Sequence, residues 1–125
     1  MPAASSAGPP EPTAPRFWRR ARVVVADQSM VPTLLPGDRL LLDRGAYRRR
    51  PPRMGEIVVF EDPEAPGRWL VKRITTVDPG RRTVEVRGDA ADVARDSRRF
   101  GPVGFAGLRG RAYRLYFPPE RRREL

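Results

Sequence analysis

The chain has 125 residues, no cysteine and no histidine, and a formal net charge of +10. Its length fits one domain with a modest core. Because cysteine and histidine supply most nucleophiles and most neutral-pH bases, their absence excludes cysteine proteases, Ser-His-Asp hydrolases, redox disulfides and zinc sites built from these residues. The absence of cysteine also fits a cytoplasmic location, which we expect for this protein.

The positive charge alone favours anionic partners such as nucleic acid or a membrane surface. The arginines are scattered, however, with clusters at 48–50 and 121–123, and neither an aromatic stacking motif nor a recognition helix accompanies them. We therefore expect no nucleic-acid partner for the main function and keep a basic nucleic-acid-binding domain as an alternative.

Residues 1–15 are small, polar and rich in proline, which predicts a disordered tail. Phe17 and Trp18 lie among arginines, so the segment 17–22 is a candidate for contact with anionic lipid, although a solvated lead-in to the first strand is favoured. The longest apolar runs, at 23–26 and 40–42, are far shorter than the roughly 20 residues that cross a bilayer. We expect neither a transmembrane anchor nor a signal peptide.

From residue 22 onward, short apolar runs are separated by Pro, Gly and Asp, without a clear helical stripe. This pattern predicts a single all-β domain of short antiparallel strands. The strands are expected at 23–26, 39–43, 56–60, 68–77, 83–87 and 108–117. The sequence DPGR at 78–81 predicts a hairpin loop in which Gly80 permits a positive φ. The domain is expected to occupy 16–119, followed by a charged tail at 120–125.

One basic position is unusual, because Lys72 is the only lysine among the 25 Lys and Arg residues. In the predicted strand Lys72 shares a face with Leu70 and Ile74, since side chains alternate between the two faces. Burial on that apolar face disfavours the ammonium form, and a pKa lowered from ~10.4 to roughly 7–8 would turn the lysine into a base. Arginine cannot lose its proton in this way. A lysine that reaches solvent at the strand edge is the ordinary alternative.

Ser29 is the serine best placed to meet such a base. Of the four serines, Ser5 and Ser6 lie in the predicted tail. Ser29 follows the first strand at a sharp exit before Pro32, where backbone N–H groups are available for an oxyanion hole. An ordinary turn serine is the alternative interpretation. Together, Ser29 and Lys72 suggest one Ser-Lys dyad.

Several motifs resemble those of the S26 family of serine peptidases, the type I signal peptidases and their relatives. In chain order these motifs are SMVPTL at 29–34 with PGD at 36–38, MGEIVVF at 54–60, VKRI at 71–74, GD at 88–89 and DSRRFGPV at 96–103. They resemble the family's nucleophile motif, its next strand, the block that carries the general base, and the last block with its Asp–Arg pair. The resemblance runs over most of the chain, and the only lysine stands at the base position.

The resemblance implies an all-β catalytic core in which Ser29 is the nucleophile and Lys72 the general base. Asp96 and Arg98 would form an ion pair that supports the site. The reaction would be hydrolysis of a peptide bond through an acyl-enzyme, with no cofactor and no metal. The substrate would bind as an extended strand, with small residues before the cleaved bond.

Three features depart from the family pattern. Type I signal peptidases carry N-terminal transmembrane helices, for which this sequence provides no segment, so we expect cytosolic substrates. Ala94 stands where many relatives have a serine that orients the lysine. Asp27 stands where relatives have Ser or Gly at the oxyanion hole. Because a carboxylate would repel the oxyanion, we expect Asp27 to turn away and to leave its backbone to donate.

Among short, arginine-rich members without an anchor, the chain is most similar to the nickel-type superoxide dismutase maturation proteases. This similarity implies a protein substrate, the nickel superoxide dismutase precursor, that loses an N-terminal propeptide. One alternative is a signal peptidase in peripheral contact with the membrane through 17–22. A second is self-cleavage at Ala7-Gly8, which the prolines that follow disfavour. A third is a non-catalytic basic β-domain, which Ala94 and Asp27 would fit.

Overall fold

The computed structural model describes residues 20–90 and 95–125. Over these ranges the main elements are antiparallel strands joined by short helical turns. The strands are β1 (Arg20–Val24), β2 (Arg39–Asp43), β3 (Ile57–Glu61), β4 (Trp69–Asp78), β5 (Thr83–Arg87), β6 (Val103–Gly104), β7 (Leu108–Phe117) and β8 (Arg123–Glu124). The helical turns are α1 (Ala46–Arg49), α2 (Ser97–Phe100), η2 (Phe105–Gly107) and η3 (Pro119–Arg121).

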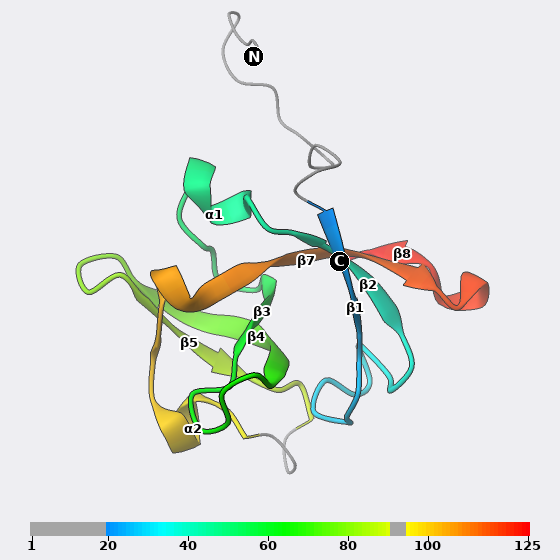
Figure 1. Ribbon diagram of the computed structural model, residues 1–125, viewed down its shortest axis with the longest axis horizontal. Coiled ribbons are helices and arrows are strands. Elements are labelled where there is room, and N and C mark those ends of the chain that lie inside the picture. The colour runs from blue at the N-terminus through cyan, green and yellow to red at the C-terminus, as the bar shows by residue number, and fades with distance from the viewer. Residues whose placement is uncertain (1–19, 91–94) are drawn as a thin grey trace, which may run out of the picture.

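The described strands form one antiparallel sheet in the order β1-β2-β7-β3-β4-β5-β6, and β8 pairs with β7. In Figure 1, β7 crosses the centre of the molecule, with β1 and β2 on one side and β3, β4 and β5 on the other. The predicted all-β fold of antiparallel strands is confirmed. Because β7 inserts between β2 and β3, the last long strand holds the two halves of the earlier chain together.

All six predicted strands are present, with small differences at their ends. The first strand spans Arg20–Val24 instead of 23–26, and just beyond it the Val25 N–H donates to the carbonyl of Asp38 at 2.9 Å. The predicted hairpin joins β4 to β5, but the positive φ of 56° belongs to Arg82 and not to Gly80. Arg82, the residue just before β5, therefore takes the left-handed conformation.

The end of the chain packs against the sheet. The sequence predicts a charged tail at 120–125, yet residues 123–124 of this segment form β8, with Arg123 opposite Leu115 and Glu124 opposite Arg114. The strand propensities of a short run of charged residues do not predict a strand. Here the strand forms because residues 123–124 pair with β7. The predicted tail at 1–15 lies outside the described residues.

Two apolar clusters of buried side chains form the core. Ile57 of β3 joins a cluster with Met30, Leu34, Leu40 and neighbours on β1, β2 and β7. The adjacent Val58 and, two residues on, Phe60 join a second cluster on β4, β5 and β6. Because successive strand residues point to opposite faces, β3 is buried on both sides.

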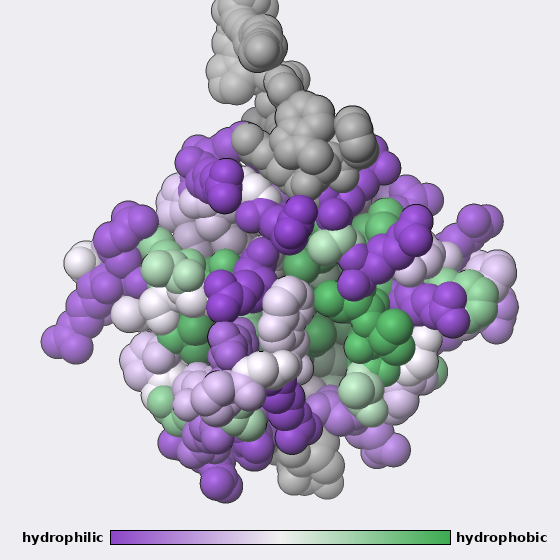
Figure 2. Space-filling view, viewed as in Figure 1, coloured by the Kyte–Doolittle hydropathy of each residue, from purple (hydrophilic) through white to green (hydrophobic). Residues whose placement is uncertain are grey.

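The surface is dominated by charged groups. Figure 2 shows hydrophilic side chains around most of the rim of the visible face, with apolar side chains exposed toward its middle. In the described part of the chain, no helix has the length and apolar character needed to cross a membrane.

Candidate active site

Ser29 lies in the loop that joins β1 to β2. The loop is closed at its base by the hydrogen bond from Val25 to Asp38 and by one from the Gly37 N–H to the Val25 carbonyl at 2.8 Å. The carbonyl of Ser29 accepts a hydrogen bond from the N–H of Ala90 at 2.9 Å. Ser29 is only 6% exposed. These contacts fix the position of the serine relative to the strands on either side.

Lys72 points into the core side of β4. Residues along this strand alternate in burial, and Lys72 is 1% exposed between the buried Leu70 and Ile74. Burial lowers the pKa of Lys72 below its ordinary value of 10.5, against an opposing attraction from Asp27 and Asp96. Over the ranges 20–90 and 95–125, the Lys72 side chain makes no hydrogen bond or ion pair. Its environment therefore makes the ammonium form less stable than in an exposed lysine.

A hollow brings Ser29 and Lys72 together. It has a volume of about 250 Å³, and its other lining residues are Asp27, Gln28, Arg68, Leu70 and Arg95. Ser29 comes from the loop after β1 and Lys72 from β4, so 43 positions of sequence separate two residues that line one space. Among the described residues, no hydrogen bond joins the Ser29 hydroxyl to the Lys72 amine.

Asp27 does not turn away from the site, which corrects the expectation from the sequence. Its carboxylate accepts a hydrogen bond from the Ser29 backbone N–H at 3.0 Å. An aspartate readily bonds to the N–H two residues ahead, so the local geometry favours this contact. Burial by itself would raise the pKa of Asp27, but hydrogen bonds from the Ser29 backbone and side chain, with attraction from Lys72 and Arg68, lower it overall. The carboxylate is therefore ionised and occupies the N–H that an oxyanion would need.

Asp96 and Arg98 form an ion pair at the end of α2 nearest the site. Asp96 is fully buried and caps α2, accepting from the Arg98 backbone N–H at 3.0 Å. The Arg98 guanidinium donates to both carboxylate oxygens, at 3.0 and 2.8 Å, and the Gly88 N–H donates at 3.3 Å. Burial opposes ionisation of Asp96, but these bonds hold its pKa below the ordinary range. The support that this pair gives to the site remains a prediction.

Ala94, at the position where the resemblance leads us to expect an orienting serine, lies outside the described residues. The next residue, Arg95, lines the hollow and forms an ion pair with the buried carboxylate of Asp62. Its Nε atom lies 3.5 Å from Glu64. Arg95 is thus held at the wall of the hollow by two carboxylates.

A clamp that the sequence analysis did not assign holds the Ser29 loop to β4. The Thr33 hydroxyl donates to Asp89 at 2.6 Å, and the same carboxylate accepts from Arg73 Nε and Nη2 at 2.9 and 2.8 Å. Arg73 is the neighbour of Lys72 on the opposite face of β4. The signal was present in the VKR and GD motifs, but their spacing alone does not show that these two side chains meet Thr33.

The C-terminal residues hold the other side of this loop. Arg121 donates to both oxygens of the buried Asp38, at 2.9 and 2.7 Å, and Asp38 also accepts from the Leu35 N–H at 2.8 Å. Arg121 and Arg123 both donate to the carbonyl of Thr33. The loop that carries Ser29 is therefore fixed by segments from distant parts of the sequence.

A second, smaller hollow of about 50 Å³ continues from Ser29 between the end of β1 and the start of β4. Exposed apolar side chains stand here, Val24 at 61% and Trp69 at 46%. In the described structure, the first residues of β4 pair with β3 on one side, while pairing with β5 begins only at Arg73. One edge of β4 beside Lys72 is therefore available to an extended chain.

Acid–base and nucleophilic chemistry are what these residues can supply. The hollow combines a hydroxyl, a buried amine and an ionised carboxylate. In the described ranges, no group of three or more Asp and Glu side chains is placed to hold a metal ion.

Comparison with known proteins gives the family. The model of the family described as "Signal peptidase, peptidase S26" matches residues 14–89, a stretch that contains Ser29 and Lys72. The chain belongs to this family, whose signal peptidases are serine proteases. The matched stretch ends before Asp96 and Arg98.

The relatives are inner membrane protease subunits and a signal peptidase by name. The chain is 34% identical over 111 residues to mitochondrial ATP-independent inner membrane protease subunit 1b of Arabidopsis thaliana, which covers 72% of the chain and 66% of the relative. Subunit 1a of the same plant is 31% identical over 113 residues, covering 74% and 67%. Probable signal peptidase I-1 of Synechocystis is 37% identical over 78 residues, covering 57% and 39%. The chain thus spans at most about two thirds of these relatives.

Proposed function

We propose that this protein is a serine endopeptidase in which Ser29 is the nucleophile and Lys72 the general base. The observation that carries the proposal is the hollow that Ser29 shares with a lysine that is 1% exposed. Membership of a family of serine peptidases supports it. Burial favours the neutral form of Lys72, and only that form can accept a proton.

The proposed reaction has two stages. Lys72 takes the proton of the Ser29 hydroxyl as its oxygen attacks the peptide carbonyl, and the resulting ammonium gives that proton to the departing amine. The acyl group then remains on Ser29. Lys72 next takes a proton from a water molecule, which attacks the ester carbonyl. That proton returns to Ser29 as the carboxylic acid product leaves, and the product then releases its own proton to solvent to become the carboxylate.

Stabilisation of the oxyanion requires the Ser29 N–H to become available. In the structure this group donates to Asp27. A substrate carbonyl that enters the site must displace the carboxylate, because two acceptors cannot share one N–H in good geometry and like charges repel. The Asp27 contact is therefore a feature of the resting enzyme that opposes the first step.

The substrate is proposed to bind as an extended strand between β1 and β4. The free edge of β4 beside Lys72 and the apolar walls formed by Val24 and Trp69 support this placement. Strand addition supplies affinity through main-chain hydrogen bonds. The specific substrate that we propose is the nickel superoxide dismutase precursor, processed in the cytoplasm by removal of its N-terminal propeptide. This choice rests on the motif resemblance, and the relatives described above carry other names.

The test is coexpression of that precursor with the native protein, the Ser29→Ala variant or the Lys72→Arg variant, followed by intact-mass spectrometry. Loss of one defined N-terminal propeptide with the native protein only is the expected result. Ser29→Ala removes the nucleophile, and Lys72→Arg keeps the charge but removes the base. Cleavage by the Lys72→Arg variant would refute the dyad, whereas an uncut precursor in all samples would refute the substrate.

A signal peptidase that works at a membrane surface is the second candidate, because the relatives are signal peptidases and inner membrane protease subunits by name. The net charge of +10 would favour anionic lipid. Cosedimentation with vesicles that contain anionic lipid, compared with neutral vesicles, separates the two. Binding to the anionic vesicles alone, with cleavage of a signal-peptide substrate by native protein, would favour this candidate.

A further inference from the structure

A larger hollow, which we call the basic hollow, lies apart from Ser29. Its volume is about 780 Å³, and it is an open hollow lined by residues at the start of α1, in the β4–β5 turn, in η2 and at the beginning of β7. It shares no lining residue with the two hollows beside Ser29. A space of this size is within the usual range for small-molecule sites, roughly 300–1,000 Å³.

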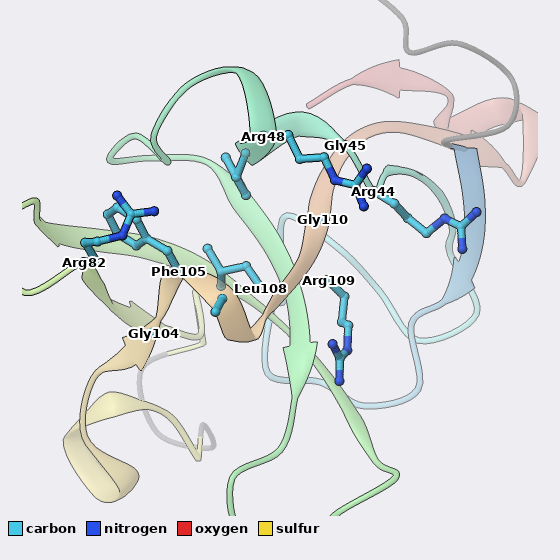
Figure 3. A pocket seen from close by; sticks show the side chains of 11 residues that line it. Arg44, Gly45, Arg48, Arg82, Gly104, Phe105, Leu108, Arg109 and Gly110 are labelled. Atoms are coloured by element: carbon cyan, nitrogen blue, oxygen red, sulfur yellow. The ribbon is translucent and has the colours of Figure 1, made fainter.

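Four arginines and no acidic residue line the basic hollow: Arg44, Arg48, Arg82 and Arg109. All four are exposed. Figure 3 shows Arg82 beside Phe105 at one end, with Arg44, Arg48 and Arg109 toward the other. Arg109 pairs with Glu61 at 3.0 Å on the exposed rim. The Arg48 side chain makes no ion pair or hydrogen bond with any residue in 20–90 or 95–125, so its charge is not compensated by a close partner there.

Arg82 is held in place by its backbone. Its φ of 56° is the only positive value for a non-glycine residue in the described ranges. The Arg82 carbonyl accepts a hydrogen bond from the Phe105 N–H at 2.9 Å, and its guanidinium lies over the Phe105 ring at 5.1 Å from the centroid. A glycine would adopt this conformation at lower cost. The turn thus fixes the Arg82 backbone beside the hollow, and the Phe105 ring is the contact of its guanidinium there.

We propose that the basic hollow binds a compact polyanion with several phosphate groups, either free polyphosphate or the phosphate chain of a nucleotide. Guanidinium groups bind phosphate oxygens through two parallel hydrogen bonds, and the arginines that line this hollow supply several positive charges for one small molecule. This site is independent of the proposed peptidase activity.

Two larger ligands fit less well. A single-stranded nucleic acid needs aromatic faces for base stacking. The Phe105 ring is already covered by Arg82, and Arg50 lies over the Tyr47 ring at 5.8 Å from its centroid. A membrane surface is broad and flat, whereas these arginines line a hollow that a compact ligand can enter. The shape therefore favours the compact ligand.

The experiment is calorimetric titration of the full chain with sodium triphosphate at low ionic strength. The double variant Arg48→Gln/Arg82→Gln removes two guanidinium groups from the hollow. The control Arg53→Gln/Arg81→Gln loses the same charge at exposed arginines outside it. We expect about one triphosphate per chain, binding roughly tenfold weaker or more in the first variant, and unchanged binding in the control.

Two results of this titration would overturn the proposal. Equal weakening in both variants would mean that net charge alone attracts triphosphate, and no heat at millimolar triphosphate would mean that no site exists. Parallel titrations use ATP, an oligonucleotide and vesicles with anionic lipid. Tighter binding of ATP than of triphosphate would identify the nucleotide as the source of the phosphate chain. The oligonucleotide or the vesicles could also displace triphosphate at a lower total concentration of phosphate groups. The ligand would then be a macromolecule, and the compact ligand would be refuted.

Discussion

The Asp27 carboxylate accepts the backbone N–H of Ser29 at 3.0 Å, so the group that would stabilise an oxyanion is occupied in the resting structure. The same carboxylate raises the pKa of Lys72 by attraction, although burial lowers that pKa overall. One side chain therefore opposes both parts of the proposed chemistry. Substitution of Asp27 therefore tests these two opposing effects while Ser29 and Lys72 stay in place.

Asp27→Ala is expected to raise kcat, on the order of tenfold, because it frees the N–H and removes a negative charge from the oxyanion. It should also move the rising limb of kcat/KM to lower pH. The sign follows from the base: Lys72 is active when neutral, Asp27 favours the charged form, and its removal lowers the pKa further. The pH dependence of peptide cleavage measures both effects. A fall in kcat with an unchanged profile would show that Asp27 positions the site.

Lys72→Met is expected to stabilise the fold by about 1–3 kcal/mol at neutral pH, because a buried amine is replaced by an apolar chain of similar length. The folded pKa of Lys72 lies below 10.5, so the unfolded chain binds more protons between the two pKa values. The stability of the native protein should therefore rise with pH through that window relative to the variant. Urea unfolding at several pH values measures the difference. A constant difference from neutral pH to above 10.5 would contradict the lowered pKa.

Asp96→Ala is expected to destabilise the protein by about 2–4 kcal/mol, since it removes a buried acceptor of four hydrogen bonds. Glu124→Ala is the matched control, because its pair with Arg114 at 2.7 Å is exposed and should contribute under about 1 kcal/mol. The folded pKa of Asp96 is below 3.8, so its contribution is present above that pH and is lost as pH falls through the folded value. Equal losses in the two variants, measured by urea unfolding, would refute the distinction.

Thr33→Val should loosen the loop that carries Ser29, because it removes the hydrogen bond to Asp89 while keeping the side-chain shape. We expect a loss of about 0.5–1.5 kcal/mol in stability and a lower kcat with little change in KM. Amide hydrogen exchange of residues 28–35 provides the readout that a general loss of stability would not reproduce. Faster exchange confined to this loop is the expected pattern, and uniform acceleration across the sheet would contradict it.

The sequence predicts the parts of this fold that depend on local alternation. The six strands and the burial of Lys72 beside Leu70 follow from side chains that change face at every residue. The position of β7 between β2 and β3, and the strand formed by residues 123–124, depend on pairing between distant segments that leaves no local pattern. The hydrogen bond between Thr33 and Asp89 could not be predicted for the same reason.

The candidate site divides in the same way. The motifs and the unusual lysine indicate Ser29 and Lys72, and the structure places both at one hollow. The expected orientation of Asp27 is based on repulsion between its carboxylate and an oxyanion. The actual orientation could not be predicted in this way, because no oxyanion is present in the resting state. There, a hydrogen bond two residues along the chain and attraction from Lys72 decide where the carboxylate lies.

The contacts of Arg121 and Arg123 with the Ser29 loop span 83 to 90 positions of sequence. A ribosome makes the Ser29 loop before it makes these two arginines. During synthesis the loop therefore lacks two of its anchors until residues 121–123 have left the exit tunnel. Until then the chain would hold Ser29 in a looser setting than the folded protein does, which would delay the proposed cleavage.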